Sequence, residues 1–160
     1  MILGDAGRGK TTFAEKLSKK VSIPLHSTDD FYYKIKYTEL NDKEKSVEEI
    51  GRIYSQSEWI VEGSTRRLAQ GGLEKSDIIY LLGFKHIIGQ YYFLIRRHFR
   101  RDNESLLGLW QLLRHITLKR YKKGYDNYAP SLHELLEPYK EKIIKLNSLK
   151  EIHKHLESIK

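Results

Sequence analysis

The feature that most constrains the fold lies at the start of the chain, where residues 4–12 read Gly-Asp-Ala-Gly-Arg-Gly-Lys-Thr-Thr. They match the pattern Gly-x-x-x-x-Gly-Lys-[Ser/Thr], with Gly4, Gly9, Lys10 and Thr11 at its fixed positions. Glycines permit a tight turn in which backbone N–H groups face a bound phosphate. Such a loop joins a strand to the N-terminus of a helix, so the motif predicts an α/β chain with a phosphate site.

The residues on either side of the loop supply both elements. Ile2 and Leu3 are apolar and are expected to end a short first strand. After the loop, Phe13, Ala14 and Leu17 fall on one face at helical spacing. The alternative is a glycine-rich surface turn before an ordinary helix. Because the flanking pattern agrees with the motif, the sequence favours the phosphate-binding loop.

The motif assigns a role to every residue of the segment. We expect ATP to be bound by Gly4, Asp5, Ala6, Gly7, Arg8, Gly9, Lys10, Thr11 and Thr12. Lys10 is predicted to reach the β- and γ-phosphates and to act in catalysis, and the Thr11 hydroxyl is predicted to bind Mg²⁺. ATP and Mg²⁺ are therefore the expected cofactors.

The composition limits the class of protein. A chain of 160 residues favours a single domain over residues 1–160. The absence of cysteine excludes disulfides and is typical of a cytoplasmic protein. The sequence contains no apolar run of membrane-spanning length and no signal segment, so we expect no membrane partner. With 29 basic and 21 acidic residues, the net charge of +8 favours polyanionic partners such as nucleotides or nucleic acid.

Hydrophobic patterning predicts strands that alternate with helices. The expected strands cover residues 1–3, 22–26, 58–63, 76–82 and 142–146. The expected helices cover about 12–21, 43–57, 66–73, 87–101, 106–123, 131–139 and 149–159, and residues 34–43 read as an irregular loop. Ser131 and Glu134 have the spacing of a capping box at the start of one helix. This alternation predicts an α/β layer fold around a parallel sheet, with a helical lid region at about 84–125.

Two acids stand where predicted strands end, and ligands of parallel α/β sheets bind at that edge. Asp29 is expected to accept a proton from an attacking hydroxyl or to hold Mg²⁺ through water. Glu62 is expected near the same Mg²⁺. The alternatives are a turn at Asp29 and a solvated strand end at Glu62. Tyr32 and Tyr33, beside Asp29, are candidates for stacking on an acceptor base.

A cluster of four arginines ends the first helix of the lid region. Arg96, Arg97, Arg100 and Arg101 form one basic edge at helical spacing, and their like charges repel one another. The cluster predicts an anionic partner, and the alternative is a solvated basic face. The seven histidines show no metal-ligand spacing, so we predict no histidine metal site.

Two short segments resemble nucleotide-related kinases. Asp29-Asp30-Phe31-Tyr32 resembles the Asp-Asp-Phe-Tyr/Phe segment of the uridine kinase and nicotinamide riboside kinase families, where the first Asp is the candidate base. Residues 60–66, Ile-Val-Glu-Gly-Ser-Thr-Arg, resemble the Asp-Gly-Phe-Pro-Arg segment of adenylate kinases, with Glu62 in place of Asp. The second resemblance implies that Arg66 contacts a phosphate of the acceptor.

Taken together, these features resemble the adenylate-kinase-related P-loop proteins, and in particular the group labelled "DNA topology modulation protein". The likeness covers nearly the whole chain. It implies a three-layer α/β/α P-loop NTPase fold whose five-stranded parallel sheet has the order 2-3-1-4-5. It also implies that lid arginines, here Arg97 and Arg101, neutralise the transferring phosphoryl group.

The sequence leaves two functions open. The first hypothesis is an ATP-dependent phosphotransferase acting on a nucleotide, a nucleoside or a similar small molecule. The second is a nucleic-acid-associated ATPase or regulator, which the positive charge and the group label favour, although no helix-turn-helix, OB or RNP pattern is visible. The identity of the acceptor and the oligomeric state do not follow from the sequence.

Overall fold

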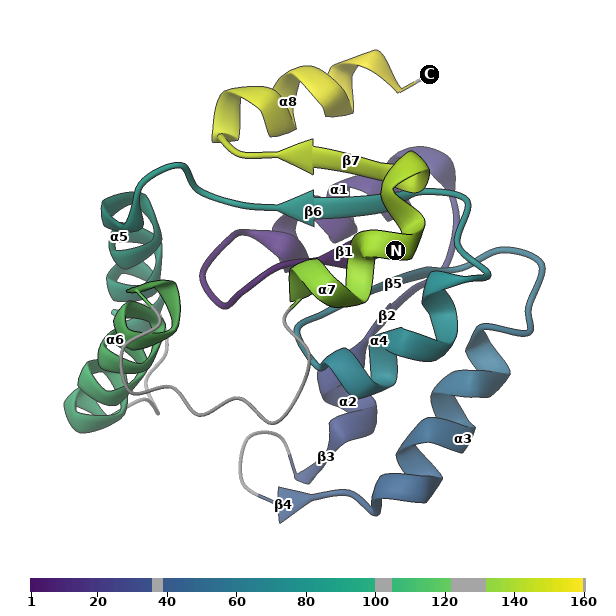
Figure 1. Cartoon of the computed structure of the whole chain (residues 1–160), viewed down its shortest axis with the longest axis horizontal. Coiled ribbons are helices and arrows are strands. Elements are labelled where there is room, and N and C mark those ends of the chain that lie inside the picture. Colours follow the sequence, from purple (N-terminus) through teal and green to yellow (C-terminus); the bar gives the residue numbers. More distant parts are fainter. Residues whose placement is uncertain (36–38, 100–104, 122–131, 160) are drawn as a thin grey trace.

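The computed structural model describes residues 1–35, 39–99, 105–121 and 132–159. Its centre is a sheet of five parallel strands with the order β2-β5-β1-β6-β7 (Figure 1). The strands are β1 (Ile2–Leu3), β2 (Leu25–Ser27), β5 (Ile60–Gly63), β6 (Ile79–Leu82) and β7 (Ile143–Leu146). The predicted α/β class with a five-stranded parallel sheet is confirmed.

A small antiparallel hairpin was not predicted from the sequence. It pairs β3 (Tyr33–Ile35) with β4 (Glu39–Leu40), within the segment expected to be irregular, and an ion pair of 3.1 Å links Lys34 to Glu39. Strands this short do not produce a recognisable alternation of polar and apolar residues. The expected order 2-3-1-4-5 counted five strands without the hairpin, whereas the strand order in the numbering of the structure is 2-5-1-6-7.

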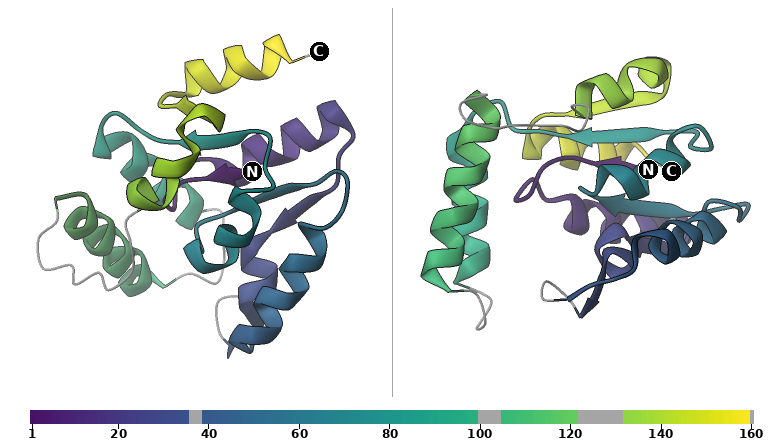
Figure 2. Two further views of the ribbon diagram at one scale, coloured as in Figure 1. Left: turned by 45° about the vertical axis from the view of Figure 1, so that its right-hand side comes forward. Right: turned by 60° about the horizontal axis from the view of Figure 1, so that its bottom comes forward.

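Helices cover both faces of the sheet (Figures 1 and 2). On one face, α1 (Lys10–Val21) and α8 (Leu149–Ser158) enclose a core around Ile2, Phe13 and Tyr80. On the other, α3 (Lys43–Ile53), α4 (Arg66–Leu73) and α7 (Leu132–Leu136) enclose a core around Leu3 and Leu73. Because successive strand residues point to opposite faces, Ile2 and Leu3 belong to different cores.

Two long helices stand beside this layered body. Figure 2 shows α5 (Ile87–His98) and α6 (Leu106–Tyr121) side by side, within the predicted lid region. Arg120 at the end of α6 donates to the carbonyl oxygen of Lys85 at 2.7 Å, so the end of α6 returns to the start of α5. Leu94 and Ile116 are buried, but much of the apolar surface of the pair is exposed, including Phe99 at 79%.

Several boundaries differ from the predicted ones. The helix expected over 131–139 is a short α7 followed by the 3-10 helix η1 (Glu137–Lys142), because Pro138 lacks the N–H that would continue α7. The strand expected from residue 76 begins at Ile79, and the helix expected to reach residue 57 ends at Ile53. Ser131, the predicted cap, lies outside the described residues. In the described part of the chain, no helix combines the length and apolarity needed to cross a membrane.

Candidate functional site

The predicted phosphate loop connects β1 to α1 in the middle of the sheet. Its three glycines have positive φ angles: 151° at Gly4, 75° at Gly7 and 76° at Gly9. Gly9 occupies the N-cap position of α1 without a side-chain cap, which leaves the first N–H groups of the helix without a capping side chain. A Cβ atom at Gly4 would lie 2.5 Å from the carbonyl oxygen of Leu82 on the neighbouring β6. The loop therefore needs glycine for conformation at all three positions and for space at Gly4.

Lys10, the first residue of α1, interacts electrostatically with three carboxylates of the site. Its Nζ donates to the carbonyl oxygen of Asp5 at 3.1 Å, so the side chain turns back over the loop. Burial lowers the pKa of the Lys10 ammonium, whereas the carboxylates of Glu62, Asp29 and Asp5 act to raise it. Both acids singled out in the sequence thus act electrostatically on the same cation.

Glu62 is the buried acid of the site, with only 5% of its surface exposed. Its Oε1 accepts hydrogen bonds from Oγ1 of Thr11 at 3.2 Å and from Oγ of Ser27 at 3.0 Å. The register of the sheet explains this meeting, because β5 lies between β1 and β2 and pairs Glu62 with both Ile2 and Ser27. Glu62 is therefore not the solvated strand end that the sequence left as the alternative.

Ser27 joins this network, and sequence reasoning missed it. It is the N-cap of the short helix α2 (Thr28–Tyr32), and its Oγ accepts from the backbone N–H of Asp29 at 3.3 Å. The signal was present, because serine before acidic residues is typical of a helix start. Asp29 consequently lies in the first turn of α2, two residues after Ser27, which contacts Glu62.

The end of β5 packs closely against the start of α2 at Gly63 and Thr28. Gly63 follows Glu62, and a Cβ atom at Gly63 would lie 1.7 Å from Oγ1 of Thr28 and 2.7 Å from its Cβ. Thr28 is fully buried, so it has little room to move aside. The absence of a side chain at Gly63 thus lets the start of α2, and with it Asp29, approach the end of β5.

Arg8 holds the loop in place through an ion pair and a hydrogen bond. Nη2 of Arg8 forms an ion pair of 2.9 Å with Oδ2 of Asp5, and Nη1 of Arg8 donates to the carbonyl oxygen of Leu82 at 3.3 Å. The Nε atom of Arg8 is buried and has no hydrogen-bond partner among the described residues. These contacts attach the tip of the loop to β6.

The predicted substrate residues lie at different depths. Arg66 begins α4, is partly buried, and lines a hollow of about 10 Å³ together with Gly4, Asp5, Gly63 and Ser64. Tyr32 ends α2 and packs against the core below α3 and α4, in edge-to-face contact with Tyr33 at 4.9 Å. Thr12, in the first turn of α1, is exposed.

The arginine cluster is only partly within the described chain. Arg97 is partly buried on α5, and Arg96 beside it is exposed. Arg100 and Arg101 lie outside the described residues.

The residues around Glu62 fit a hard divalent cation. A hydroxyl oxygen of Thr11 and a carboxylate oxygen of Glu62 lie 3.2 Å apart, and oxygen ligands in small number are what Mg²⁺ uses alongside phosphate oxygens and water. Among the described residues, no group of three or more His, Asp or Glu side chains forms a metal site of its own. The donor set suits a metal held mainly by a phosphate ligand.

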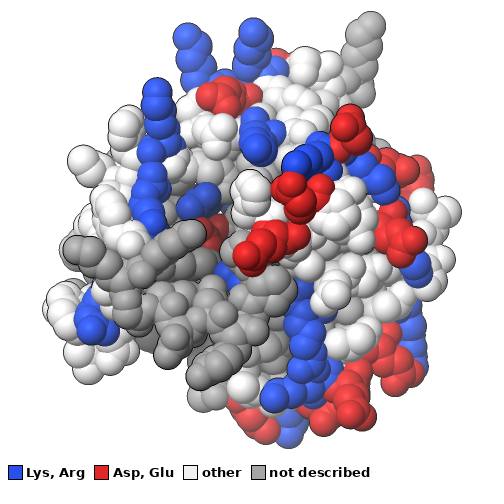
Figure 3. Space-filling model, in the orientation of Figure 1, with Lys and Arg blue, Asp and Glu red and all other residues white. Residues whose placement is uncertain are grey.

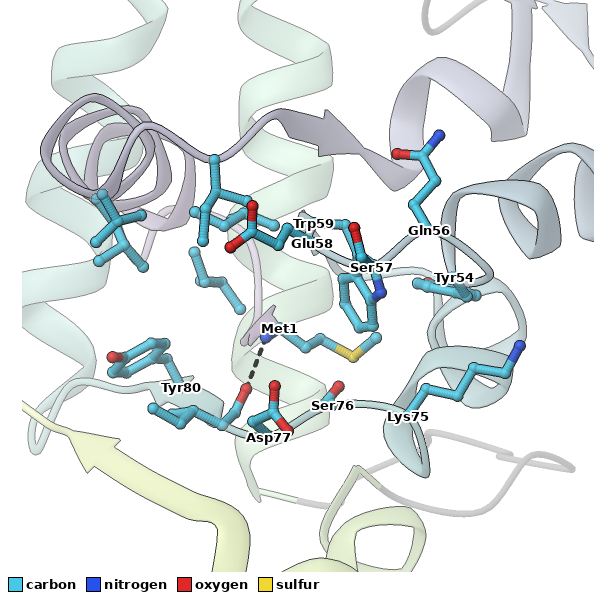
Figure 4. A pocket seen from close by; sticks show the side chains of 16 residues that line it. Met1, Tyr54, Gln56, Ser57, Glu58, Trp59, Lys75, Ser76, Asp77 and Tyr80 are labelled. Carbon is cyan, nitrogen blue, oxygen red and sulfur yellow. Dashed lines mark hydrogen bonds between the residues drawn. The ribbon is translucent and has the colours of Figure 1, made fainter.

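A cavity of about 510 Å³ lies at the opposite edge of the sheet, by the amino ends of the strands (Figure 4). Its labelled wall residues include Tyr54, Trp59, Ser76, Asp77 and Tyr80. The amino group of Met1 points into this region and donates to the carbonyl oxygen of Ile78 at 2.7 Å. None of the predicted site residues lines this cavity.

Comparisons with known proteins support the fold. An uncharacterized protein from Eubacterium ventriosum ATCC 27560 matches with a TM-score of 0.55 and 16% identity, over 98% of this chain and 96% of that chain. An unliganded sugar kinase from Janibacter sp. HTCC2649 matches with a TM-score of 0.52 and 15% identity, over 98% of this chain and 90% of that one. The chain shares its overall fold with both of these proteins. No family model and no curated protein matches its sequence.

Proposed function

We propose that the protein is an ATP-dependent phosphotransferase that transfers the γ-phosphoryl group of MgATP to a small-molecule acceptor. The observation that carries the proposal is the convergence of Lys10, Glu62 and Asp29 at the loop between β1 and α1. A solved sugar kinase with the same fold supports it. The resemblance to adenylate-kinase-related proteins, on the loop and on residues 60–66, supports it as well.

Binding in this proposal is carried by the loop. The backbone N–H groups of residues 4–12 and the positive end of α1 would hold the phosphates of ATP. Lys10 would stabilise the charge that develops on the transferring group, and its burial strengthens that interaction because little water screens it. Thr11 and Glu62 would hold Mg²⁺, which would supply further positive charge to the site.

Asp29 decides which class of acceptor the site serves. A hydroxyl acceptor must lose a proton, and in this proposal Asp29, in the first turn of α2, accepts it. A phosphate acceptor is already an anion and needs no base. Arg66, beside the loop on α4, and Tyr32 are the proposed contacts to the acceptor. Arg97 on α5, together with Arg101, is proposed to neutralise the transferring phosphoryl group.

The proposal is tested by ATP consumption, screened against sugars, nucleosides, nucleoside monophosphates and small alcohols. Lys10→Ala should lower turnover at least ~100-fold, because the loop then lacks its cation. Lys16→Ala is the matched control, since Lys16 is an exposed lysine of the same helix. Full turnover in Lys10→Ala, or no ATP binding by the wild-type protein, would overturn the proposal.

Replacement of Asp29 separates the acceptor classes. Asp29→Asn should lower turnover with a hydroxyl acceptor by at least ~100-fold and change turnover with a phosphate acceptor much less. The exposed neighbour Asp30 provides the control variant Asp30→Asn. A small effect of Asp29→Asn on every accepted alcohol would exclude it as the base.

A nucleic-acid-associated ATPase or regulator is the second candidate. Its supporting observation is that residues 84–99 and 105–121 contain no acid. Most of the acidic side chains visible in Figure 3 lie in the centre and at the right of the view. Helices α5 and α6 carry exposed aromatic side chains, including Tyr92 and Trp110. Binding through phosphates weakens steeply with salt. A gel-shift titration without a complex at low salt would dispose of this candidate.

A further inference from the structure

Helix α5 carries a buried polar side chain that the proposed mechanism does not use. Gln90 is completely buried, and its Nε2 donates to the carbonyl oxygen of Ala6 in the loop at 2.7 Å. Its Oε1 has no hydrogen-bond partner among the described residues. A buried amide with one unsatisfied atom costs stability that a leucine of similar size would not cost. The donor contact to the loop is therefore the feature that distinguishes Gln90 from an apolar core residue.

A second contact joins the same helix to the loop one turn later. Leu94 is fully buried, and a Cβ atom at Gly7 would lie 2.6 Å from its Cγ and 2.8 Å from its Cδ2. Gln90, Leu94 and Arg97 follow one another at the i, i+4 and i+7 positions, so they share one face of α5. The face that carries Arg97 is thus in direct contact with Ala6 and Gly7.

The geometry of the peptide bond gives the Gln90 contact a specific effect. No peptide bond among the described residues is cis, and in a trans peptide the C=O and N–H groups point in opposite directions. Because the Ala6 carbonyl is directed at Gln90, the N–H of Gly7 is directed away from α5. That N–H belongs to the set expected to face the phosphates.

We propose that Gln90 is a positioning residue, which orients the Ala6–Gly7 peptide for anion binding and fixes α5 in register with the loop. The inference rests on the proposed function, because it assigns the oriented N–H to a phosphate of the nucleotide. Gln90 itself lies behind the loop and contacts no ligand in this proposal.

The first test compares Gln90→Leu with Gln111→Leu, an exposed position on α6 that serves as the matched control. Calorimetric titration with MgADP should show a dissociation constant raised about tenfold in Gln90→Leu and unchanged in the control. The melting temperature of Gln90→Leu should change little, because loss of the donor to the Ala6 carbonyl and removal of the unsatisfied Oε1 act in opposite directions. Equal affinity in Gln90→Leu and the wild type would overturn the inference.

The variant Gln90→Glu adds a readout that a merely structural role would not change. A carboxylate cannot donate to the Ala6 carbonyl, whereas a protonated carboxyl group can. MgADP affinity relative to the wild type should therefore be low at pH 8 and recover toward pH 5.5, and Gln90→Leu should not recover. A pH-independent Gln90→Glu would overturn the inference even if Gln90→Leu fails to fold.

Failure of the proposed function can be told apart from failure of this inference. If the wild type binds no nucleotide, the proposed function fails. The orientation of the Ala6–Gly7 peptide can then still be monitored through the amide NMR signal of Gly7. Gln90→Leu should shift that signal and speed its hydrogen exchange, whereas Gln111→Leu should change neither. An unchanged Gly7 signal would refute the positioning role independently of any ligand.

Discussion

The two edges of the sheet differ in what they offer a ligand. The carboxyl edge concentrates charges and hydrogen bonds around Lys10 and Glu62, and among the described residues it holds a hollow of about 10 Å³. The amino edge holds a cavity of about 510 Å³ whose walls include Tyr54 and Trp59. The larger volume therefore lies on the edge without the predicted chemistry.

The candidate site and the cavity of about 510 Å³ therefore do not coincide. The polar groups of the carboxyl edge come from β1, β2 and β5, which end side by side because the strands are parallel. The groups of the amino edge come from strand starts and from the segments that precede them. If the comparison holds, substitutions at the carboxyl edge should affect turnover, and those at the amino edge should affect stability alone.

The largest effect is expected at Gly63. Gly63→Ala places a methyl group against the buried Thr28 and should lower the free energy of unfolding by about 3 kcal/mol. Any folded fraction should have lost turnover, since α2 and Asp29 must shift. Gly51→Ala is the matched control on α3, where a Cβ meets nothing within 4 Å, and it should gain up to about 1 kcal/mol. Urea unfolding measures both, and equal stability of the two variants would contradict the close packing.

The second-largest effect is expected at Glu62, with Glu58 as the matched control. Glu62→Gln removes charge but keeps an oxygen that accepts from Thr11 and Ser27, so it should fold and lose about 100-fold in turnover. Glu58→Gln changes an exposed acid at the amino edge, just before the same strand, and should keep full turnover. Turnover assayed over a Mg²⁺ titration separates the two. Comparable losses of turnover in both variants would contradict the prediction that only the carboxyl edge serves the reaction.

The smallest effect is expected at Tyr54, on the cavity side. Its hydroxyl donates to the carbonyl oxygen of Leu68 at 2.9 Å, so Tyr54→Phe should lower the free energy of unfolding by about 1 kcal/mol at pH 7. Turnover should not change. The exposed Tyr92 provides the control variant Tyr92→Phe. A loss of turnover in Tyr54→Phe would mean that the cavity edge serves the reaction.

The pH dependence of the same variant has a defined sign. Burial raises the pKa of Tyr54 above its usual value of 10.0, so the folded state holds the phenolic proton more tightly than the unfolded state does. The stability that this provides is fully present below pH 10 and is lost as the pH rises above it. Urea midpoints measured from pH 8 to pH 11 should therefore fall less steeply in Tyr54→Phe than in the wild type.

The elements of the site that the sequence predicts are those with a local signal. The glycine pattern marks the loop, and apolar runs that end in an acid mark Glu62 and the region of Asp29. Their meeting at Lys10 follows from parallel strands, because all carboxyl ends lie on one edge. The roles assigned to these residues remain predictions, and Arg101 lies outside the described chain.

The contacts that the sequence did not predict are long-range. Gln90 reaches Ala6 across 84 residues of sequence, and Thr28 faces Gly63 from a neighbouring element. Neither residue type signals such a partner, because a glutamine on a helix is ordinarily exposed. The β3–β4 hairpin was missed for a different reason, since two-residue and three-residue strands have no readable period.

One oxygen atom of Glu62 has a wider consequence. It is shared by hydroxyls from two segments that are otherwise separate, the first turn of α1 and the end of β2. Since Ser27 also caps α2, a displacement of the Thr11 hydroxyl is transmitted through a single carboxylate to the backbone of Asp29. The first turn of α1 and the start of α2 are thus coupled through one carboxylate oxygen, so a shift of either hydroxyl changes the hydrogen bond available to the other.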